Sequence, residues 1–84
     1  MQDIKKLIKE CLAKSKFKLT LHAAERMSER YVFEADIKSC GKTAKKVEFQ
    51  ADNNTWKAIG KDLDGDKLTV ICTFKDGVLI VTVY

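Results

Sequence analysis

The side chains best suited to chemistry gather in residues 20–30, which read Thr-Leu-His-Ala-Ala-Glu-Arg-Met-Ser-Glu-Arg. This segment holds the only histidine of the chain, His22, and its only two arginines, Arg26 and Arg30. The three residues are four positions apart, so on an α-helix each lies about 40° around the axis from the one before it. One imidazole and two guanidiniums then form a single line, which we call the basic row (His22, Arg26 and Arg30).

This combination of side chains suits cleavage of RNA without a metal ion. Such a reaction needs a base for the 2′-hydroxyl, an acid for the 5′-oxygen and cations for the charge that develops on the phosphate. A histidine is the side chain whose ordinary pKa fits proton transfer near neutral pH. Arginines hold a phosphate through two parallel hydrogen bonds, which lysines cannot do. Thr20 is a suitable N-cap, and it places His22 in the positively polarised first turn of the helix.

Three other interpretations of the basic row remain open at this stage. Glu25 and Glu29 lie beside the arginines, as on many solvent-exposed helix faces. The row could instead bind an RNA backbone or an acidic protein without any reaction. It could also be structural, with His22 and the arginines bridging helix and sheet through buried hydrogen bonds. If His22 is buried against a backbone carbonyl, the structural role is favoured. If His22, Arg26, Arg30 and Thr82 converge on one open cleft, an enzyme or a binding module is favoured.

The bulk composition predicts a single globular domain over residues 1–84. The chain carries a net charge of +4, with 45% hydrophobic and 33% charged residues. That balance is typical of a folded protein, and its mild positive charge allows an RNA partner. No apolar run is long enough to cross a membrane, and the first residues lack the apolar block of a signal peptide. We therefore expect a cytoplasmic protein with no membrane partner.

The cysteines do not indicate a metal site or a disulfide framework. Cys11, Cys40 and Cys72 are odd in number and far apart, and no Cys-x-x-Cys motif occurs. The sequence therefore predicts no metal ion and no cofactor. Small buried hydrophobic side chains are the simplest role for all three cysteines.

Three helices are predicted in the first half of the chain. Apolar residues with helical spacing predict an amphipathic helix from about Asp3 to Lys14, within an N-terminal addition of residues 1–16. Alternating residues at 17–21 indicate a short extended piece before the helix of the basic row, which spans about 21–30. A third helix is expected over 33–40, with Gly41 as the left-handed residue that ends it.

After Gly41 the apolar residues alternate, which predicts four β-strands in an antiparallel meander. Asp76-Gly77 is the strongest hairpin signal among the turns. Helices followed by strands indicate an α+β fold in which the N-terminal helices pack on one face of a four-stranded antiparallel sheet. In the last strand we expect Leu79, Val81 and Val83 to face the helices and Ile80, Thr82 and Tyr84 to face away. Lys57 is a further cation that the sheet could present.

Several short motifs resemble a known family when they are taken together. Residues 19–30 resemble the S/T-x-H-A-x-x-R-x-x-x-R opening of a bacterial domain-of-unknown-function family. That family is related to the RelE and ParE toxins and to the barnase–EndoU–colicin–RelE ribonuclease fold. Ala58-Ile59-Gly60, Asp64-Gly65 and the closing Val81-Thr82-Val83-Tyr84 resemble its strands. The resemblance covers about residues 17–84 and leaves the first helix outside.

The resemblance implies a RelE-like or barnase-like α+β domain with a toxin-like activity. On that basis we expect a metal-independent endoribonuclease whose catalytic residues are His22, Arg26, Arg30 and Thr82. Lys57 and Tyr84 would then bind the substrate RNA. The alternative is a non-catalytic RNA- or protein-binding module of a toxin–antitoxin-like system. In either case the expected partners are RNA and an antitoxin or immunity-type protein.

Overall fold

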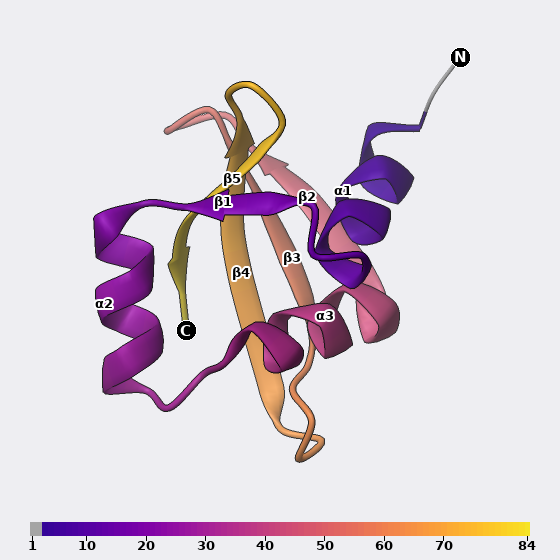
Figure 1. Cartoon of the computed structure of the whole chain (residues 1–84). Helices are drawn as coiled ribbons and strands as arrows, with labels where there is room; N and C mark the ends of the chain where they lie inside the picture. Colours follow the sequence, from indigo (N-terminus) through magenta and orange to yellow (C-terminus); the bar gives the residue numbers. More distant parts are fainter. Residues whose placement is uncertain (1–2) are drawn as a thin grey trace.

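The computed structural model describes residues 3–84 and has the predicted α+β architecture (Figure 1). The predicted N-terminal addition of residues 1–16 begins with two residues that lie outside the described range. In chain order the elements are α1 (Ile4–Ala13), β1 (Phe17–Leu19), α2 (Leu21–Glu29), α3 (Glu34–Thr43), β2 (Lys46–Gln50), β3 (Thr55–Lys61), β4 (Lys67–Phe74) and β5 (Val78–Val83). None of the helices in residues 3–84 has the length and hydropathy that a membrane-spanning helix requires.

The sheet has five strands and is mixed, so the prediction of four antiparallel strands is wrong. Its order is β1-β5-β4-β3-β2. Strands β2 to β5 form the predicted antiparallel meander, and both Asp76 and Gly77 have the positive φ of a tight hairpin turn. The additional strand, β1, pairs in parallel with β5 at the edge of the sheet. Because β1 has only three residues, its alternation indicates extended backbone but cannot identify a distant pairing partner.

All three helices contribute to one hydrophobic core on one face of the sheet. In Figure 1, α1 and α3 lie in front of the sheet, and α2 stands beside β5. Buried residues from the helices and from alternate positions of the strands form a single cluster: Ile8, Leu12, Ala23, Met27, Val32, Ile37, Cys40, Val47, Ala58, Leu68, Val70, Cys72, Val78, Ile80 and Val83. No helix within residues 3–84 covers the opposite face, which we call the open face.

Strand β5 contains a β-bulge that changes which side chains face the core. Cys72 of β4 pairs with Ile80, whereas the preceding residue, Ile71, pairs with Thr82. Val81 is therefore one extra residue on β5, and such an insertion reverses the alternation of the strand.

The bulge corrects the predicted faces of β5. Val78 and Ile80 are buried before the bulge, and Val83 is buried after it. Val83 therefore faces the helices as predicted, but the predictions that Leu79 faces them and that Ile80 faces away are wrong. Strict alternation from Leu79 to Val83 would leave Ile80, which is 0% exposed, on the open face.

Two glycines allow α3 to lie close against α1 and β3. Helix α3 continues to Thr43, so the prediction that Gly41 ends it is wrong. Gly41 is buried inside the helix, where an added Cβ atom would lie 2.6 Å from the backbone nitrogen of Ala13. On the other side of α3, a Cβ atom on Gly60 would lie 2.5 Å from the carbonyl oxygen of Cys40. Both distances are shorter than any ordinary contact, so these positions accept only glycine without movement of the backbone.

Burial makes two of the three free cysteines poorly reactive. Cys11 is half-buried, and Cys40 and Cys72 are buried in the core. Burial raises the pKa of Cys40 to about 11 and that of Cys72 to about 12, from an ordinary value of 9.0. The thiolate is the reactive form of cysteine, so both core thiols are almost entirely in the unreactive form near neutral pH.

The Gly41→Ala variant should be less stable than the parent. Alanine in place of glycine normally stabilises the interior of a helix by about 0.5–1 kcal/mol. At Gly41 the added methyl group would collide with α1, and such overpacking typically costs about 1–3 kcal/mol. The free energy of unfolding, measured in urea, should therefore fall. Lys42→Ala changes the next, exposed residue of the same helix and should have little effect. An increase in stability for Gly41→Ala would contradict the close α1–α3 contact.

Thiol labelling of the native protein at pH 8 should modify one cysteine quickly and two only after unfolding. Mass spectrometry of peptides should locate the fast site at Cys11. Because the core thiols have higher pKa values in the folded than in the unfolded chain, their contribution to stability is complete below about pH 9 and declines as the pH rises towards 11–12. Fast labelling of Cys40 or Cys72 in the folded protein would show that the core is more open than described.

Candidate functional site

Thr20 fixes the start of α2 to strand β5 at the bulge. Its hydroxyl oxygen accepts a hydrogen bond from the backbone N–H of Ala23 at 3.0 Å, which is the predicted N-cap. The same hydroxyl donates to the carbonyl of Val81 at 3.0 Å. The backbone N–H of Thr20 donates to the carbonyl of Ile80, also at 3.0 Å. Three hydrogen bonds at one residue thus determine where the helix begins relative to the sheet.

The predicted helix of the basic row is confirmed, with its last member at the helix end. Ala23 and Met27 are buried against the sheet. His22 and Arg30 are exposed, and Arg30 is the C-cap residue of α2. Arg26 is half-buried, and its Nη1 atom lies 3.7 Å from Oε2 of Glu29. That ion pair is long and partly solvated, so Arg26 keeps most of its capacity to bind an anion.

His22 and Arg26 lie on the flank of α2 that is turned away from the other helices. On an α-helix Ala24 lies about 100° to one side of the buried Ala23, and His22 lies about 100° to the other side. Ala24 faces a hollow of about 420 Å³ on the helical side of the sheet, lined by Leu19, Ala24, Met27, Ser28, Tyr31, Val32, Phe33 and Glu34. His22, and Arg26 one turn later, therefore occupy the flank that borders the open face beside β5.

The remaining three predicted site residues lie together on the open face. Lys57 of β3 and Thr82 of β5 both pair with Ile71 of β4, one from each side. Their Cα atoms are therefore two strand spacings apart, roughly 10 Å. The Nζ atom of Lys57 lies 5.9 Å from the centre of the Tyr84 ring, within range of a cation–π interaction. One cation, one hydroxyl and one aromatic ring thus border the same part of the sheet.

The open face carries more positive charge than the sequence patterns indicated. Lysines 46, 57, 61 and 67 share this face through the strand register, and Glu48 is the one acidic residue that β2–β5 place on it. Lys46 Nζ lies 2.9 Å from Glu48 Oε1, and this hydrogen-bonded pair lowers the pKa of Glu48 and raises that of Lys46. The spacing of four between Lys57 and Lys61 is the sequence signal for two cations on one side of a strand.

The structure does not link the basic row directly to the other predicted residues. Among residues 3–84, no hydrogen bond or ion pair joins His22, Arg26 or Arg30 to Lys57, Thr82 or Tyr84. Helix α2 packs on β5, the strand that carries Thr82, whereas Lys57 lies on β3, two strands further into the sheet. His22 is exposed and is not held against a backbone carbonyl, so the structural interpretation of this histidine is wrong.

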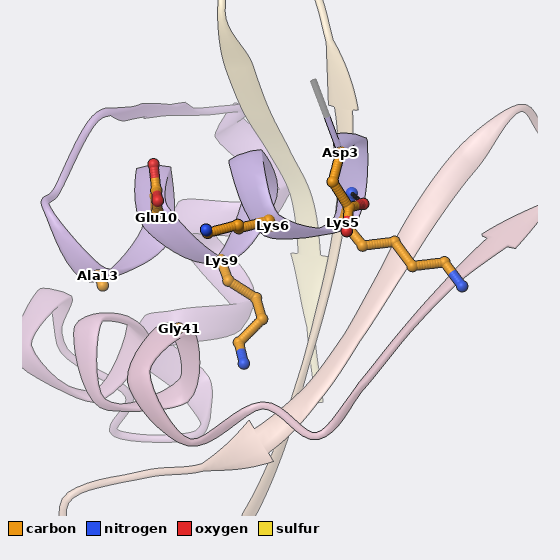
Figure 2. A pocket seen from close by; sticks show the side chains of 7 residues that line it. All are labelled: Asp3, Lys5, Lys6, Lys9, Glu10, Ala13 and Gly41. Atoms are coloured by element: carbon orange, nitrogen blue, oxygen red, sulfur yellow. Dashed lines mark hydrogen bonds between the residues drawn. The ribbon is translucent and has the colours of Figure 1, made fainter. Parts of the chain in front are cut away.

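A larger hollow lies in the helical layer and is not part of this site. Its volume is about 540 Å³, and it is lined by Asp3, Lys5, Lys6, Lys9, Glu10, Ala13 and Gly41. Figure 2 shows that its three lysine side chains diverge, and that acidic residues accompany them. The hollow therefore does not focus positive charge on one point.

The Thr20→Val variant tests whether one hydroxyl positions α2. Valine keeps the shape of threonine but loses both the cap and the hydrogen bond to β5. We expect the free energy of unfolding to fall by about 1–3 kcal/mol. Thr20→Ser retains the hydroxyl and should lose much less. Chemical denaturation of the two variants provides the comparison, and equal losses would mean that the hydroxyl is not what holds the helix start.

Comparison with known proteins places the site within a family. No curated protein and no solved structure matches the chain, and the relation to the RelE and ParE toxins stays a prediction. A sequence family described as a domain of unknown function (DUF4258) matches residues 19–84, which include every predicted site residue. All of α1 and the first two residues of β1 precede the matched region. The match covers well over half of the chain, and the protein therefore belongs to the DUF4258 family.

Proposed function

We propose that this protein is a metal-independent endoribonuclease that binds RNA on the open face and cleaves it beside His22. The main support is the position of His22 and Arg26 on the flank of α2 that borders a sheet face rich in lysines and hydroxyls. The resemblance of residues 19–30 to the opening of a family related to RelE and ParE toxins supports the same activity, and it suggests a related fold.

Binding begins with the phosphate groups of the RNA. In this proposal Arg26 and Arg30 hold one phosphate through their planar guanidiniums. Lys57 supplies a further cation from the sheet, and the Thr82 hydroxyl can donate a hydrogen bond to a phosphate oxygen. The Tyr84 ring, which is 41% exposed, offers a surface on which a base can stack.

Cleavage then uses His22 as the base. The neutral imidazole accepts the proton of the 2′-hydroxyl, and the 2′-oxygen forms a bond to phosphorus. The bond from phosphorus to the 5′-oxygen breaks, which leaves a 2′,3′-cyclic phosphate and a 5′-hydroxyl end. The arginines stabilise the charge that develops on the phosphate, commonly the largest catalytic contribution. The 5′-oxygen takes its proton from water, and His22 loses its proton to the solvent.

A second candidate function is RNA binding without cleavage. It is favoured by the residue types on the sheet side of the site, because Lys57, Thr82 and Tyr84 include no second histidine or carboxyl group that could donate a proton to the leaving oxygen. An acidic partner protein of the antitoxin or immunity type could also cover the open face. Such a partner would compete with RNA for the same cations.

The His22→Ala variant separates cleavage from binding. We expect cleavage of a fluorescent single-stranded RNA in EDTA to fall by about 10²–10⁴-fold, the usual contribution of one acid–base group. Affinity for a cleavage-resistant RNA with 2′-O-methyl groups should change little. If the parent binds RNA but does not cut it, the non-catalytic module is the correct function.

The conservative variants Arg26→Lys and Arg30→Lys test the phosphate contacts at constant charge. Each should weaken RNA binding and slow cleavage, because lysine cannot form the paired hydrogen bonds of a guanidinium. Lys14→Arg, on the helical side, is the matched control and should behave like the parent. If both arginine variants bind as well as the parent, the basic row is not the phosphate site. A parent that neither binds nor cuts RNA at low salt would rule out both functions.

A further inference from the structure

Another hollow lies where α3 leads into β2, at the end of the β3–β4 hairpin. Its volume is about 440 Å³, and it is lined by Thr43, Lys45, Lys46, Ile59, Gly60, Lys61, Gly65 and Lys67. Four of these eight residues are lysines, and none is acidic. We call this group the lysine corner (Lys45, Lys46, Lys61 and Lys67). The hollow in Figure 2 is different, because its lining also includes the acidic residues Asp3 and Glu10.

Two lysines of the corner face each other directly across the sheet. Lys61 of β3 pairs with Lys67 of β4 in the antiparallel register. Like charges in directly opposite positions destabilise a sheet. Among residues 3–84, no carboxylate lies within 4.0 Å of the ammonium group of either lysine. The fold therefore keeps an unfavourable pair at this place.

Within residues 3–84, no aspartate of the β3–β4 hairpin loop forms an ion pair with Lys61 or Lys67. The hairpin loop contains three aspartates, but the Asp62 carboxylate accepts hydrogen bonds from the backbone N–H groups of Asp64 and Asp66, each at 2.9 Å. The carboxylate of Asp62 is therefore used to shape the loop. Asp64 and Asp66 are exposed and do not line the hollow.

The lysine corner continues the open face along β3 towards the β3–β4 hairpin. Lys61 lies four residues beyond Lys57 on β3, so its side chain is on the same face about 13 Å further along the strand. When both side chains extend straight from the sheet, their ammonium groups are about as far apart and contact different phosphates. An RNA strand that passes Lys57 would reach the corner with a different phosphate.

We propose that the lysine corner is a second phosphate subsite, which holds the backbone of a single-stranded RNA several nucleotides from the phosphate at the basic row. The proposal rests on the proposed function for the identity of the polymer. The subsite itself rests only on the hollow, its four lysines, of which Lys46 is also ion-paired with Glu48, and the opposed pair. The proposed substrate is an extended single strand that spans the basic row and the lysine corner. The proposal also gives a function to lysines that the cleavage reaction does not use.

The double variant Lys61→Gln/Lys67→Gln, which we call the corner variant, removes the two opposed charges. Its control is Lys14→Gln/Lys42→Gln, which loses the same charge from exposed positions of the helical layer. For a cleavage-resistant RNA of 12 nucleotides, the corner variant should bind about 25-fold more weakly at 0.1 M salt, and its slope of log affinity against log salt should fall by about 1.4. For a three-nucleotide RNA, too short to span both places, affinity should be unchanged. The control should match the parent in both assays.

A second measurement tests the subsite independently of RNA. Tripolyphosphate, titrated at low salt, should shift the NMR signals of the Gly60 and Gly65 amides in the parent and in His22→Ala, but not in the corner variant. If tripolyphosphate binds there while the parent binds no RNA, the subsite stands and the proposed function fails. If the corner variant keeps the parent's RNA affinity and salt slope, or if tripolyphosphate causes no shifts, the subsite is wrong.

A charge reversal separates a binding role from a structural one. Lys67→Glu should raise the Tm, because it turns the opposed lysines into an ion pair, and it should lower affinity for the 12-nucleotide RNA. A lower Tm together with unchanged RNA affinity would mean that the lysines serve the fold and not a ligand.

Discussion

The hydrogen bonds of Thr20 are the constraint on which the arrangement of the site depends. The hydroxyl caps α2 and binds the carbonyl of Val81, the extra residue of the β5 bulge. The bulge returns Val83 to the core, and it sets Thr82 beside Ile71 on the open face. One side chain therefore fixes both the start of the basic row and the part of the sheet that the row borders. Without the bulge, the end of β5 would present different side chains to each face.

A second constraint on the fold is the close packing of the helical layer. Because Gly41 and Gly60 lack side chains, α1, α3 and β3 approach one another closely enough to enclose the core from one side. The core is therefore enclosed without a layer of helices on the open face. The central residues of this face, Thr69 and Ile71, are nevertheless only 1% and 6% exposed. The face can consequently carry lysines and hydroxyls that a two-sided core would exclude.

The sequence predicted those elements in which apolar residues repeat regularly over several positions. It did not predict features that depend on contacts between segments far apart in the chain. Helical spacing located α2 and its cap at Thr20, and alternation located the meander. Alternation indicated the extended segment that becomes β1, but three residues are too few to show that it pairs with β5. A one-residue bulge and a glycine within a helix give no periodic signal, so Val81 and Gly41 were misassigned. Within the site, Thr82 and Tyr84 were placed on the correct face, because the error before the bulge does not extend beyond it. The lysine corner depends on pairing between strands, which the sequence does not display.

The family match and the hydrophobic core have different boundaries, because α1 lies outside the match but packs into the core. The family match begins at Leu19, yet Ile8 and Leu12 of α1 are completely buried, and Gly41, within the matched region, lies against the α1 backbone. A fragment expressed from residue 19 onward would leave the groove beside Gly41 as exposed apolar surface. Relatives that lack an equivalent of α1 must fill that groove with another segment or with a bulkier residue in place of the glycine. The residue at this position should therefore vary together with the presence or absence of a preceding helix.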